Sequence, residues 1–307
     1  MQPLILPVLL ASFWTVCTGS ADWCYQSQFT CEHQCNAPAM WDHASSNCAG
    51  SVQSPINIVT RKTLKDERLT HFEFKNYKQI ITSRVKNNGH SVQVEIPHLS
   101  SISGGGLPNT YKAVQFHLHW GNDGGPGSEH TIDGEQYPME LHIVHMKHHY
   151  TDLKTALSDP EGVAVLGFFY EMSNSENQKY DPLISSLQKI TATNTNTSLL
   201  STSLAQLIPS ETNLTSYYRY KGSLTTPPCT EAVIWTVFEN PIPLSMNQLK
   251  AFSELRFADK KQMVDNFRPI QRLNGRQVFW SGSAMTLASS VLLVSAITMA
   301  LGMAQPN

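Results

Sequence analysis

The sequence has no excess of positive charge. Lys and Arg number 22 against 24 Asp and Glu, which gives a formal net charge of −2 at pH 7. Proteins that bind nucleic acid usually carry a basic stripe or a strongly basic balance. The composition therefore argues against nucleic acid as a partner. With 307 residues, 41% of them hydrophobic, the chain is long enough to bury a substantial core.

Between its two ends the sequence lacks internal repeats, heptad runs and low-complexity linkers, so we expect a single domain. Helical patterns are few and short, and the clearest are capped amphipathic turns at 181–189 and 245–252. Segments of alternating or β-rich composition recur instead. They predict strands at 91–96, 113–120, 140–146, 163–170 and 233–238. The predicted fold class is mainly β.

Charged side chains are absent from residues 1–20, an apolar run that ends in small residues. This pattern predicts a secretory signal peptide that is cleaved near Gly19 or Ser20. The alternative is an uncleaved anchor, because the run also lacks the usual Lys or Arg at its start. A cleaved signal would place the rest of the chain in the secretory pathway.

A second apolar run occupies 283–304 and is long enough to cross a bilayer. No Lys or Arg follows it, although a spanning helix with a cytoplasmic tail usually shows one. Ser281, Gly282 and Ser283 are small residues just before the run, as attachment of a GPI lipid requires. We therefore favour a GPI anchor at Ser281 or Ser283 over a single spanning helix. Residues 282–307 would be removed, leaving 21–281 as a domain on the extracellular face of the plasma membrane.

Cysteine is scarce, and one of the six lies in the predicted signal peptide. The remaining cysteines are Cys24, Cys31, Cys35, Cys48 and Cys229. An oxidising compartment favours disulfides, and four of these cysteines cluster where a mature N-terminus gains most from being tied down. Spacing alone does not pair them, and an odd number leaves one free or paired between molecules.

Asn196 (NTS) and Asn213 (NLT) match the N-glycosylation sequon. Both lie in stretches rich in Ser, Thr and Asn that are typical of surface loops. A bare sequon is weak evidence, but the predicted secretory pathway makes both residues candidates for glycosylation.

The predicted strand at 113–120 carries apolar residues on one face and Gln115, His117 and His119 on the other. His117 and His119 therefore project from the same face. The segment at 140–145 is a second strand pattern that places Glu140 and His142 on one face. Three neutral imidazoles leave a tetrahedral zinc ion one open position, which is the catalytic arrangement. We predict a zinc site at His117, His119 and His142.

Ligating histidines need an acceptor for their other ring N–H. Gln115 and Glu140 each precede a candidate ligand by two residues on the same face, so each is a candidate acceptor. The alternative is that these histidines are simply bonded to neighbours without a metal. His145 lies on the opposite face and is predicted to be a core residue, whereas His148 and His149 are predicted to lie in a solvated loop.

A series of short motifs resembles those of the α-class carbonic anhydrases, in order and at the family's spacing. The motifs are SPINI (54–58), NNGH (87–90), QFHLHWG (115–121), SEHT (128–131), ELHIVH (140–145), AVLG (164–167), GSLTTPPCTE (222–231) and NFRPIQ (266–271). They cover nearly the whole predicted mature domain. The resemblance implies a large central twisted, mostly antiparallel sheet with short surface helices. The signal, Cys229 and the apolar tail are most like the membrane-anchored branch of the family.

The resemblance implies reversible hydration of carbon dioxide to bicarbonate and a proton, with zinc bound by the three histidines. Thr225 would accept a hydrogen bond from the zinc hydroxide and donate its own hydroxyl proton to Glu129. Because a hydroxyl donates only once, a carboxylate acceptor forces Thr225 to accept from the nucleophile. Thr226 would contact bicarbonate, and His90 would carry the released proton to buffer. The alternative for His90 is an exposed loop histidine.

An apolar slot would hold carbon dioxide beside the metal. The residues implied for it are Val144, Val165, Leu224, Val233 and Trp235. The alternative is that they form ordinary sheet core. A slot this narrow argues against bulky esters as the main substrates of the same hydroxide.

The membrane-anchored pattern also implies the disulfides Cys24–Cys35 and Cys48–Cys229, which leaves Cys31 over. The second disulfide would brace the loop that carries Thr225 and Thr226. The alternative interpretation is a related binding module that no longer turns over substrate. Such modules usually lack one of the zinc histidines, whereas His117, His119 and His142 are all present here. A bicarbonate-producing enzyme on the cell surface would have bicarbonate or ion transporters as candidate partners.

Overall fold

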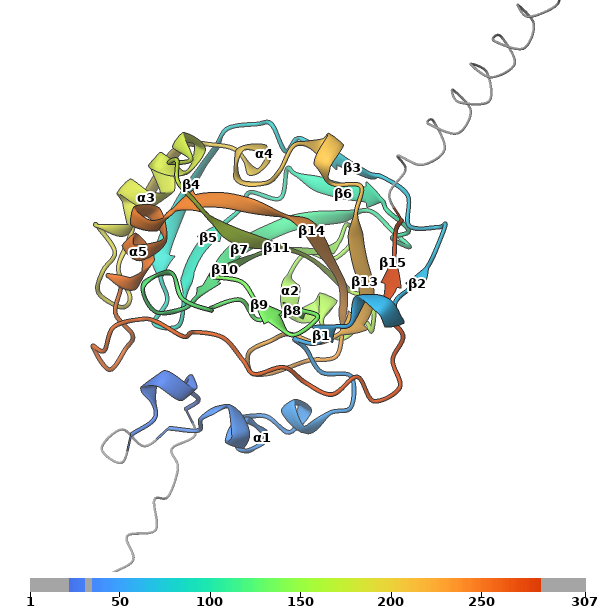
Figure 1. The fold of residues 1–307 in the computed structure, drawn as a ribbon, viewed down its shortest axis with the longest axis horizontal. Helices are drawn as coiled ribbons and strands as arrows, with labels where there is room; N and C mark the ends of the chain where they lie inside the picture. Colours follow the sequence, from blue (N-terminus) through green and yellow to red (C-terminus); the bar gives the residue numbers. More distant parts are fainter. Residues whose placement is uncertain (1–21, 31–34, 283–307) are drawn as a thin grey trace, which may run out of the picture.

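The structure is a computed structural model that describes residues 22–30 and 35–282 (Figure 1). The predicted signal peptide at 1–20, Cys31, Ser283 and the rest of the apolar tail lie outside the described residues. Within the described ranges, no helix is long and apolar enough to cross a membrane.

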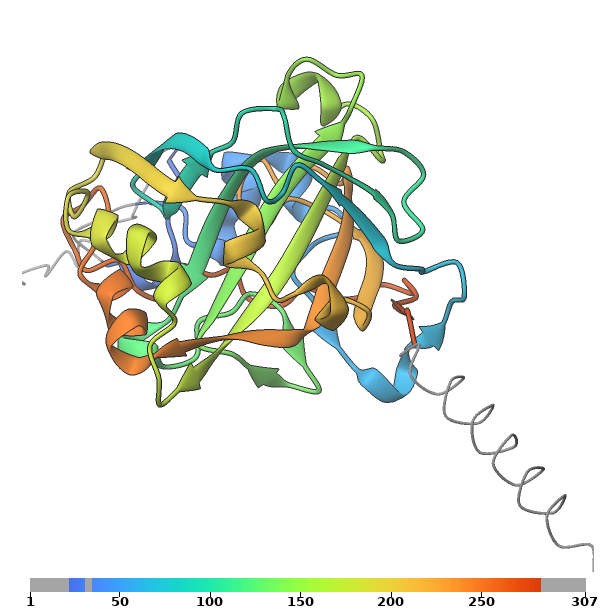
Figure 2. The same cartoon turned by 90° about the horizontal axis from the view of Figure 1, so that it is seen from above.

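A twisted 12-stranded mixed sheet crosses the molecule (Figures 1 and 2). Its main path runs in the order β12 (Asn196–Thr202), β4 (Ile81–Asn87), β5 (Val92–Glu95), β7 (Tyr111–Trp120), β10 (Met139–Lys147), β11 (Val163–Ser173), β14 (Val233–Ser245), β13 (Tyr217–Gly222), β15 (Phe279–Trp280) and β2 (Leu64–Lys65). Off this path, β3 (Phe72–Lys75) pairs with β6 (Ser101–Gly104), which pairs with β7. Most neighbours are antiparallel, while β11–β14 and β15–β2 are parallel. The predicted fold class is confirmed.

A smaller sheet and short helices complete the fold. The three-stranded sheet contains β1 (Asn57–Ile58), β8 (Thr131–Ile132) and β9 (Glu135–Gln136). The α-helices are α1 (Trp41–Ala44), α2 (Leu153–Ala156), α3 (Asp181–Leu187), α4 (Leu204–Leu207) and α5 (Met246–Ser253). The 3₁₀ turns are η1 (Gln26–Gln28), η2 (Pro38–Met40), η3 (Ser46–Ala49), η4 (Thr60–Lys62), η5 (Asn122–Gly124), η6 (Gln178–Tyr180) and η7 (Glu211–Asn213). Helices α3 and α5 lie side by side at one end of the large sheet (Figures 1 and 2).

The sequence patterns located the central strands and the two longer helices. Each predicted strand coincides with an observed one, but β14 continues seven residues past the predicted end at Phe238 to Ser245. Pro241 and Pro243 lie in this extension, and proline donates no hydrogen bond to a ladder. The pairing of β14 with β11 shifts register between Phe238 and Ile242, so Pro241 has no partner in β11 and the strand resumes beyond it.

The core lies on both faces of the large sheet. One cluster of buried side chains includes Phe116, Leu118 and Trp120, which are 0–1% exposed. The cluster on the other face includes Val144 and Trp235. Because alternate residues of a strand point to opposite faces, the apolar residues of β7 pack into the first cluster while His117 and His119 face the second side. That packing fixes the direction in which the two histidines project.

Candidate metal centre

The three predicted ligands come together at the centre of the large sheet. Strands β7 and β10 are antiparallel neighbours, and their register places His142 directly opposite His117 and Glu140 opposite His119. One nitrogen from each of the three imidazoles lies within 4.8 Å of the others, a spacing that can hold a metal ion. His119 and His142 are 1% exposed.

Each imidazole is held by a hydrogen bond at its other nitrogen. Nδ1 of His117 lies 2.9 Å from Oε1 of Gln115, and Nε2 of His142 lies 2.7 Å from Oε1 of Glu140. Nδ1 of His119 lies 2.7 Å from the main-chain carbonyl of Asn266. All three partners are acceptors, so these ring nitrogens carry the protons. The remaining nitrogens, Nε2 of His117, Nε2 of His119 and Nδ1 of His142, therefore present lone pairs to one another.

The three imidazole nitrogens that carry no proton lie close to one another and to a carboxylate. Nδ1 of His142 lies 3.3 Å from Nε2 of His117, and Nε2 of His119 lies 3.4 Å from Oε2 of Glu129. Both His119 Nε2 and Glu129 Oε2 are buried without a hydrogen-bond partner among the described residues. Lone pairs and a carboxylate oxygen that converge in a buried space repel one another unless a cation lies among them. The donor set therefore fits a zinc ion, which takes imidazole nitrogens in a tetrahedral arrangement.

Burial keeps His117 and His119 in the form that binds metal. Loss of water lowers the pKa of His117 well below its ordinary value, and the nearby His119 and His142 lower it further. Burial also lowers the pKa of His119, although Glu129 opposes that shift. Metal ligation requires neutral imidazole, so the fold removes the competing proton before a metal binds.

Glu140 holds His142 through an unusually complete set of hydrogen bonds. Its Oε2 accepts from the main-chain N–H groups of Glu129 and His130 at 2.9 and 2.8 Å, and its Oε1 lies 2.7 Å from both His130 Nδ1 and His142 Nε2. Burial alone would raise the pKa of Glu140, but His130 and His142 outweigh it and hold the pKa well below the usual range. Glu140 is therefore an ionised acceptor at neutral pH.

The support extends to residues that the sequence reasoning missed. His130 Nε2 lies 2.6 Å from the hydroxyl of Tyr220, which lies 2.9 Å from Oγ of Ser54. Asn266 was also missed, although it accepts from His119 with its carbonyl and from the Trp120 N–H with Oδ1 at 2.7 Å. His130 and Asn266 belong to motifs quoted above, but no local pattern indicates which ligand they contact.

Glu129 is buried beside His119 and His142, and Thr225 is buried in the loop between β13 and β14. Oε1 of Glu129 accepts from the main-chain N–H of Arg268 at 2.9 Å. Thr225 is 5% exposed, and Thr226 is half-buried beside it in the loop between β13 and β14. Among the described residues, Thr225 does not donate a hydrogen bond to Glu129. Oε2 of Glu129 has no hydrogen-bond partner and is therefore the oxygen that could accept one.

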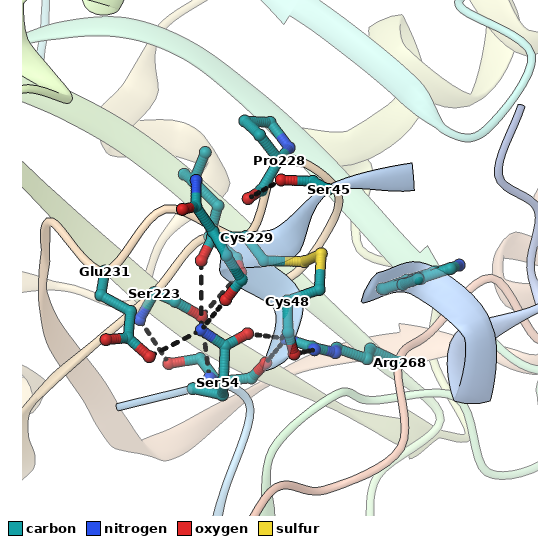
Figure 3. Close-up of a disulfide and its surroundings, with 12 residues drawn as sticks. Ser45, Cys48, Ser54, Ser223, Pro228, Cys229, Glu231 and Arg268 are labelled. Atoms are coloured by element: carbon teal, nitrogen blue, oxygen red, sulfur yellow. Dashed lines mark hydrogen bonds between the residues drawn. A yellow bond between two sulfur atoms is a disulfide. The ribbon is translucent and has the colours of Figure 1, made fainter. Parts of the chain in front are cut away.

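A disulfide fixes the loop that carries these threonines (Figure 3). Cys48 is bonded to Cys229, and Cys24 is bonded to Cys35. Around the first of these, Oγ of Ser45 donates to the carbonyl of Pro228 at 3.0 Å, and Nη2 of Arg268 donates to the carbonyl of Cys48 at 3.2 Å (Figure 3). Both pairs are those that the resemblance implies.

The apolar residues implied for the slot gather on the metal side of the sheet. Val144, Val165, Val233 and Trp235 are 1–3% exposed and belong to one cluster, against which half-buried Leu224 packs. The Trp235 ring lies 4.8 Å from the His142 ring, centroid to centroid. Its indole N–H donates to the Ser223 carbonyl at 3.0 Å, which ties the tryptophan to the threonine loop.

His90 lies in the turn between β4 and β5 and is half-buried. Its ring stacks on Trp23 at 3.9 Å with an interplanar angle of 15°. Burial lowers the pKa of His90, and Asp22 partly opposes this shift. Nδ2 of Asn266 donates to the His90 carbonyl at 3.1 Å, so Asn266 contacts both His90 and the ligand His119. The Trp23 stack joins residues 67 positions apart and had no signal in the sequence.

The secondary predictions for the other histidines are confirmed. His145 is fully buried, with Nε2 at 2.6 Å from the hydroxyl of Tyr77. His148 and His149 are exposed in a turn after β10. Asn196 and Asn213 are exposed as well, although Asn196 begins β12 and does not lie in a loop.

A twisted mixed sheet whose adjacent strands present three braced histidines defines an enzyme of the carbonic anhydrase type. The model of the eukaryotic-type carbonic anhydrase family matches residues 36–282, and the chain belongs to that family. Carbonic anhydrase 4 of Oryctolagus cuniculus is 42% identical over 300 residues, which cover 96% of each chain. Carbonic anhydrase 15 of Mus musculus is 36% identical and covers 97% of this chain and 94% of its own. Carbonic anhydrase 12 of Homo sapiens is 37% identical, over 86% of this chain and 76% of its own.

Proposed function

We propose that this carbonic anhydrase hydrates carbon dioxide with a zinc ion held by His117, His119 and His142. The observation that supports it is the convergence of three ring nitrogens whose opposite nitrogens are all committed to acceptors. When bound there, zinc supplies a hydroxide nucleophile near neutral pH. The protein's own residues must then orient that nucleophile, place the gas and remove the proton.

Glu129 and Thr225 would orient the nucleophile. Oε2 of Glu129 has no hydrogen-bond partner among the described residues, so it would accept from the Thr225 hydroxyl, and Thr225 would then accept from the hydroxide. Thr226, next in the loop, would contact bicarbonate. Val144, Val165, Leu224, Val233 and Trp235 would exclude water from the gas, since carbon dioxide offers no charge for a polar site to hold.

The direct test is stopped-flow hydration of carbon dioxide by the full chain, with and without a zinc chelator. We expect a rate well above buffer that is lost on chelation and restored by zinc. The rate should also fall by orders of magnitude in Thr225→Ala, while an exposed threonine variant, Thr212→Ala, should match the wild type. A chain with no zinc-dependent rate would instead be a binding module.

His90 would carry the proton to buffer. An ordinary imidazole titrates near neutral pH, and although burial lowers the pKa of His90, its half-buried position beside Trp23 leaves the side chain partly exposed to solvent. In His90→Ala we expect slower turnover at low buffer concentration and recovery on addition of imidazole, whereas the exposed control His149→Ala should be unaffected. A rate that is unchanged in His90→Ala at low buffer would remove His90 from this role.

We also propose that residues 1–20 are a signal peptide and that 21–281 form a domain held on the extracellular face of the plasma membrane by a GPI lipid. The candidate attachment residues remain Ser281 and Ser283. The lipid joins the main-chain carboxyl of the attachment residue, so the hydrogen bonds of the Ser281 hydroxyl, to the Thr215 carbonyl at 2.7 Å and from the Tyr217 N–H at 3.0 Å, do not distinguish the two. Release of activity from cells by a phosphatidylinositol-specific phospholipase would support the lipid. Activity that stays on the membrane would favour a spanning helix.

The exposed Asn196 and Asn213 are proposed glycosylation sites, and bicarbonate or ion transporters are proposed partners of the surface enzyme. Treatment with a glycosidase, combined with Asn196→Gln and Asn213→Gln, would show which sequon is occupied. A transporter partner would appear as faster bicarbonate flux when the active chain is co-expressed with it, and the Thr225→Ala chain separates catalysis from contact.

A further inference from the structure

A second cavity, of about 460 Å³, lies where β13, β15 and the chain after β2 meet. Six charged side chains line it: Asp66, Arg68, Glu161, Arg219, Lys221 and Arg276. The zinc-site histidines do not line it, and Tyr220 forms part of its wall. The cavity is therefore distinct from the proposed active site.

The charges in this cavity do not balance. Asp66 pairs with Arg68 at 2.8 Å, and Glu161 pairs with Lys221 at 2.7 Å. Arg219 and Arg276 have no carboxylate within 4.0 Å in the described part of the chain, so the lining holds two more cations than carboxylates. A charge taken out of water without a partner is costly, so the two arginines favour an anion in the cavity.

Arg219 is the more deeply buried of the two arginines, at 8% exposed. Its Nε and Nη2 donate to Oγ1 of Thr236 at 3.2 and 3.0 Å, and Nη2 also donates to the Gly105 carbonyl at 2.9 Å. Its guanidinium also lies 5.8 Å from the Phe72 ring centroid. Nη1 donates to no group in the described ranges, so its two protons are available to a ligand.

Burial lowers the pKa of Arg219 to about 10, which still leaves the guanidinium charged at neutral pH. Arg276 is held differently. It lies 5.6 Å above the Tyr220 ring and donates to main-chain carbonyls, including those of Gln53 at 2.7 Å and Lys221 at 3.0 Å. Most N–H donors of Arg276 are thus already engaged with carbonyls. Arg276 therefore contributes positive charge to the cavity rather than hydrogen-bond donors.

The remaining lining includes apolar side chains, among them Leu69, Ile234 and Phe279. A concave site with apolar walls and a few fixed polar groups is the usual form of a small-molecule site, and 460 Å³ lies within its usual range. A guanidinium matches the geometry of carboxylate and phosphate groups. We propose that this cavity binds a small organic anion, with its carboxylate or phosphate at Arg219 and its apolar body against Ile234 and Phe279.

The test measures binding of three probes to the zinc-loaded full chain by calorimetry: phenyl phosphate, benzoate and inorganic phosphate. We expect phenyl phosphate or benzoate to bind at least about tenfold more tightly than inorganic phosphate, because only the first two can use the apolar walls. Equal affinity for inorganic phosphate would overturn the assignment of an organic ligand. Failure of all three probes to bind at millimolar concentration would overturn the site.

Variants locate the binding. In Arg219→Gln the affinity should fall at least about tenfold, because a charge-assisted hydrogen bond is lost. Gln277 is an exposed residue of the same lining, and its Nε2 donates to the carbonyls of Lys62 and Val278 at 3.0 and 2.7 Å. Gln277→Glu adds a repelling carboxylate at the loss of these two hydrogen bonds and should weaken binding about threefold or more. Glu161→Gln removes a carboxylate that competes with the anionic probe for the positive charges, so it should tighten binding of the probe.

A matched control separates this cavity from the zinc site, where anions could also bind. His117→Ala should abolish hydration of carbon dioxide and leave binding of the organic probe unchanged. Gln277→Glu should weaken binding of the organic probe and leave hydration of carbon dioxide unchanged. Probe binding that disappears in His117→Ala and survives in both Arg219→Gln and Gln277→Glu would refute the proposal without affecting the proposed enzymatic function.

Discussion

At the scale of single residues, the candidate metal centre depends on the acceptors behind the ligands as much as on the ligands. Glu140 is fully buried and accepts four hydrogen bonds, one of them from His142. An isolated buried carboxylate would be expensive, but this one is surrounded by donors, so its charge fixes the tautomer and direction of His142. The same reasoning applies to Gln115 behind His117 and to the Asn266 carbonyl behind His119.

Replacement of Glu140 by Gln should lower zinc affinity by about 10- to 100-fold, the usual range for loss of a group that orients a metal ligand. The amide keeps the shape of the side chain but removes the charge that favours the His142 proton on Nε2. Zinc affinity is measured by competition with a chromogenic chelator. The exposed Glu135→Gln is the matched control, and equal zinc affinity in the two variants would contradict the role given to Glu140.

His145 offers a test of acid stability away from the metal. Burial lowers its pKa to about 3, against 6.5 for an ordinary histidine. The unfolded chain therefore binds this proton below pH 6.5 while the folded chain does not until about pH 3. The folded state loses about 1.4 kcal/mol per pH unit from this group across that window, about 5 kcal/mol in all as an upper limit.

In His145→Gln this contribution should disappear, because glutamine does not titrate yet still offers an acceptor to Tyr77. The free energy of unfolding, measured by denaturant at a series of pH values, should therefore fall less steeply between pH 6 and pH 4 than in the wild type. His148→Gln, at an exposed position, should keep the wild-type slope. An identical slope in His145→Gln would mean that His145 titrates normally in the folded state.

At the scale of elements, the pairing of β7 with β10 assembles the site. A slip of one residue in this pairing would turn His142 to the far face of the sheet, because side chains alternate along a strand. The apolar residues of both strands prevent that slip, since it would expose Phe116, Leu118, Leu141 and Ile143, which are 0–1% exposed. The register irregularity of this pair falls between Val144 and His145, beyond the last ligand.

The loop between β13 and β14 is the other element on which the site depends. The double variant Cys48→Ser, Cys229→Ser should lower stability by about 2–5 kcal/mol. It should also lower the hydration rate, because the disulfide braces the loop of Thr225 and Thr226. Denaturant unfolding and stopped-flow hydration check the two effects. Cys24→Ser, Cys35→Ser is the matched comparison and should spare the threonine loop. Chemical mapping that found Cys229 as a free thiol would rule out this account.

At the scale of the whole molecule, the fold has enough core to persist without the metal. The two clusters of buried side chains cover both faces of the sheet and consist almost entirely of apolar residues outside the ligand set. A zinc ion that binds only the folded state would therefore add stability, and we expect the sheet to form without it. This separates the chain from small metal domains that unfold without zinc.

Removal of zinc should leave the far-ultraviolet circular dichroism unchanged and lower the midpoint of thermal unfolding. The shift should grow with the concentration of free zinc, because the stabilisation follows RT ln(1 + [Zn]/Kd). Loss of the β-sheet signal on chelation at 25 °C would contradict this prediction.

The sequence predicts some parts of the site better than others for a physical reason. Strand alternation is a local property, so residues two apart, such as His117 with Gln115 and His142 with Glu140, could be assigned to one face directly. The acceptor for His119 lies 147 residues away at Asn266, and the stack of His90 on Trp23 likewise joins distant segments. The extension of β14 through two prolines was missed because local propensity predicts a turn there.

The sequence by itself determined a mainly β fold, the three candidate ligands with two of their acceptors, and the core position of His145, because each follows from the alternation of residues along individual strands. Only the tertiary structure decided which ring nitrogens are free, how His130, Tyr220 and Asn266 support the ligands, and which arginines lie without a carboxylate in the second cavity. These features join segments that are far apart in the chain, and chain folding alone brings them within hydrogen-bonding distance.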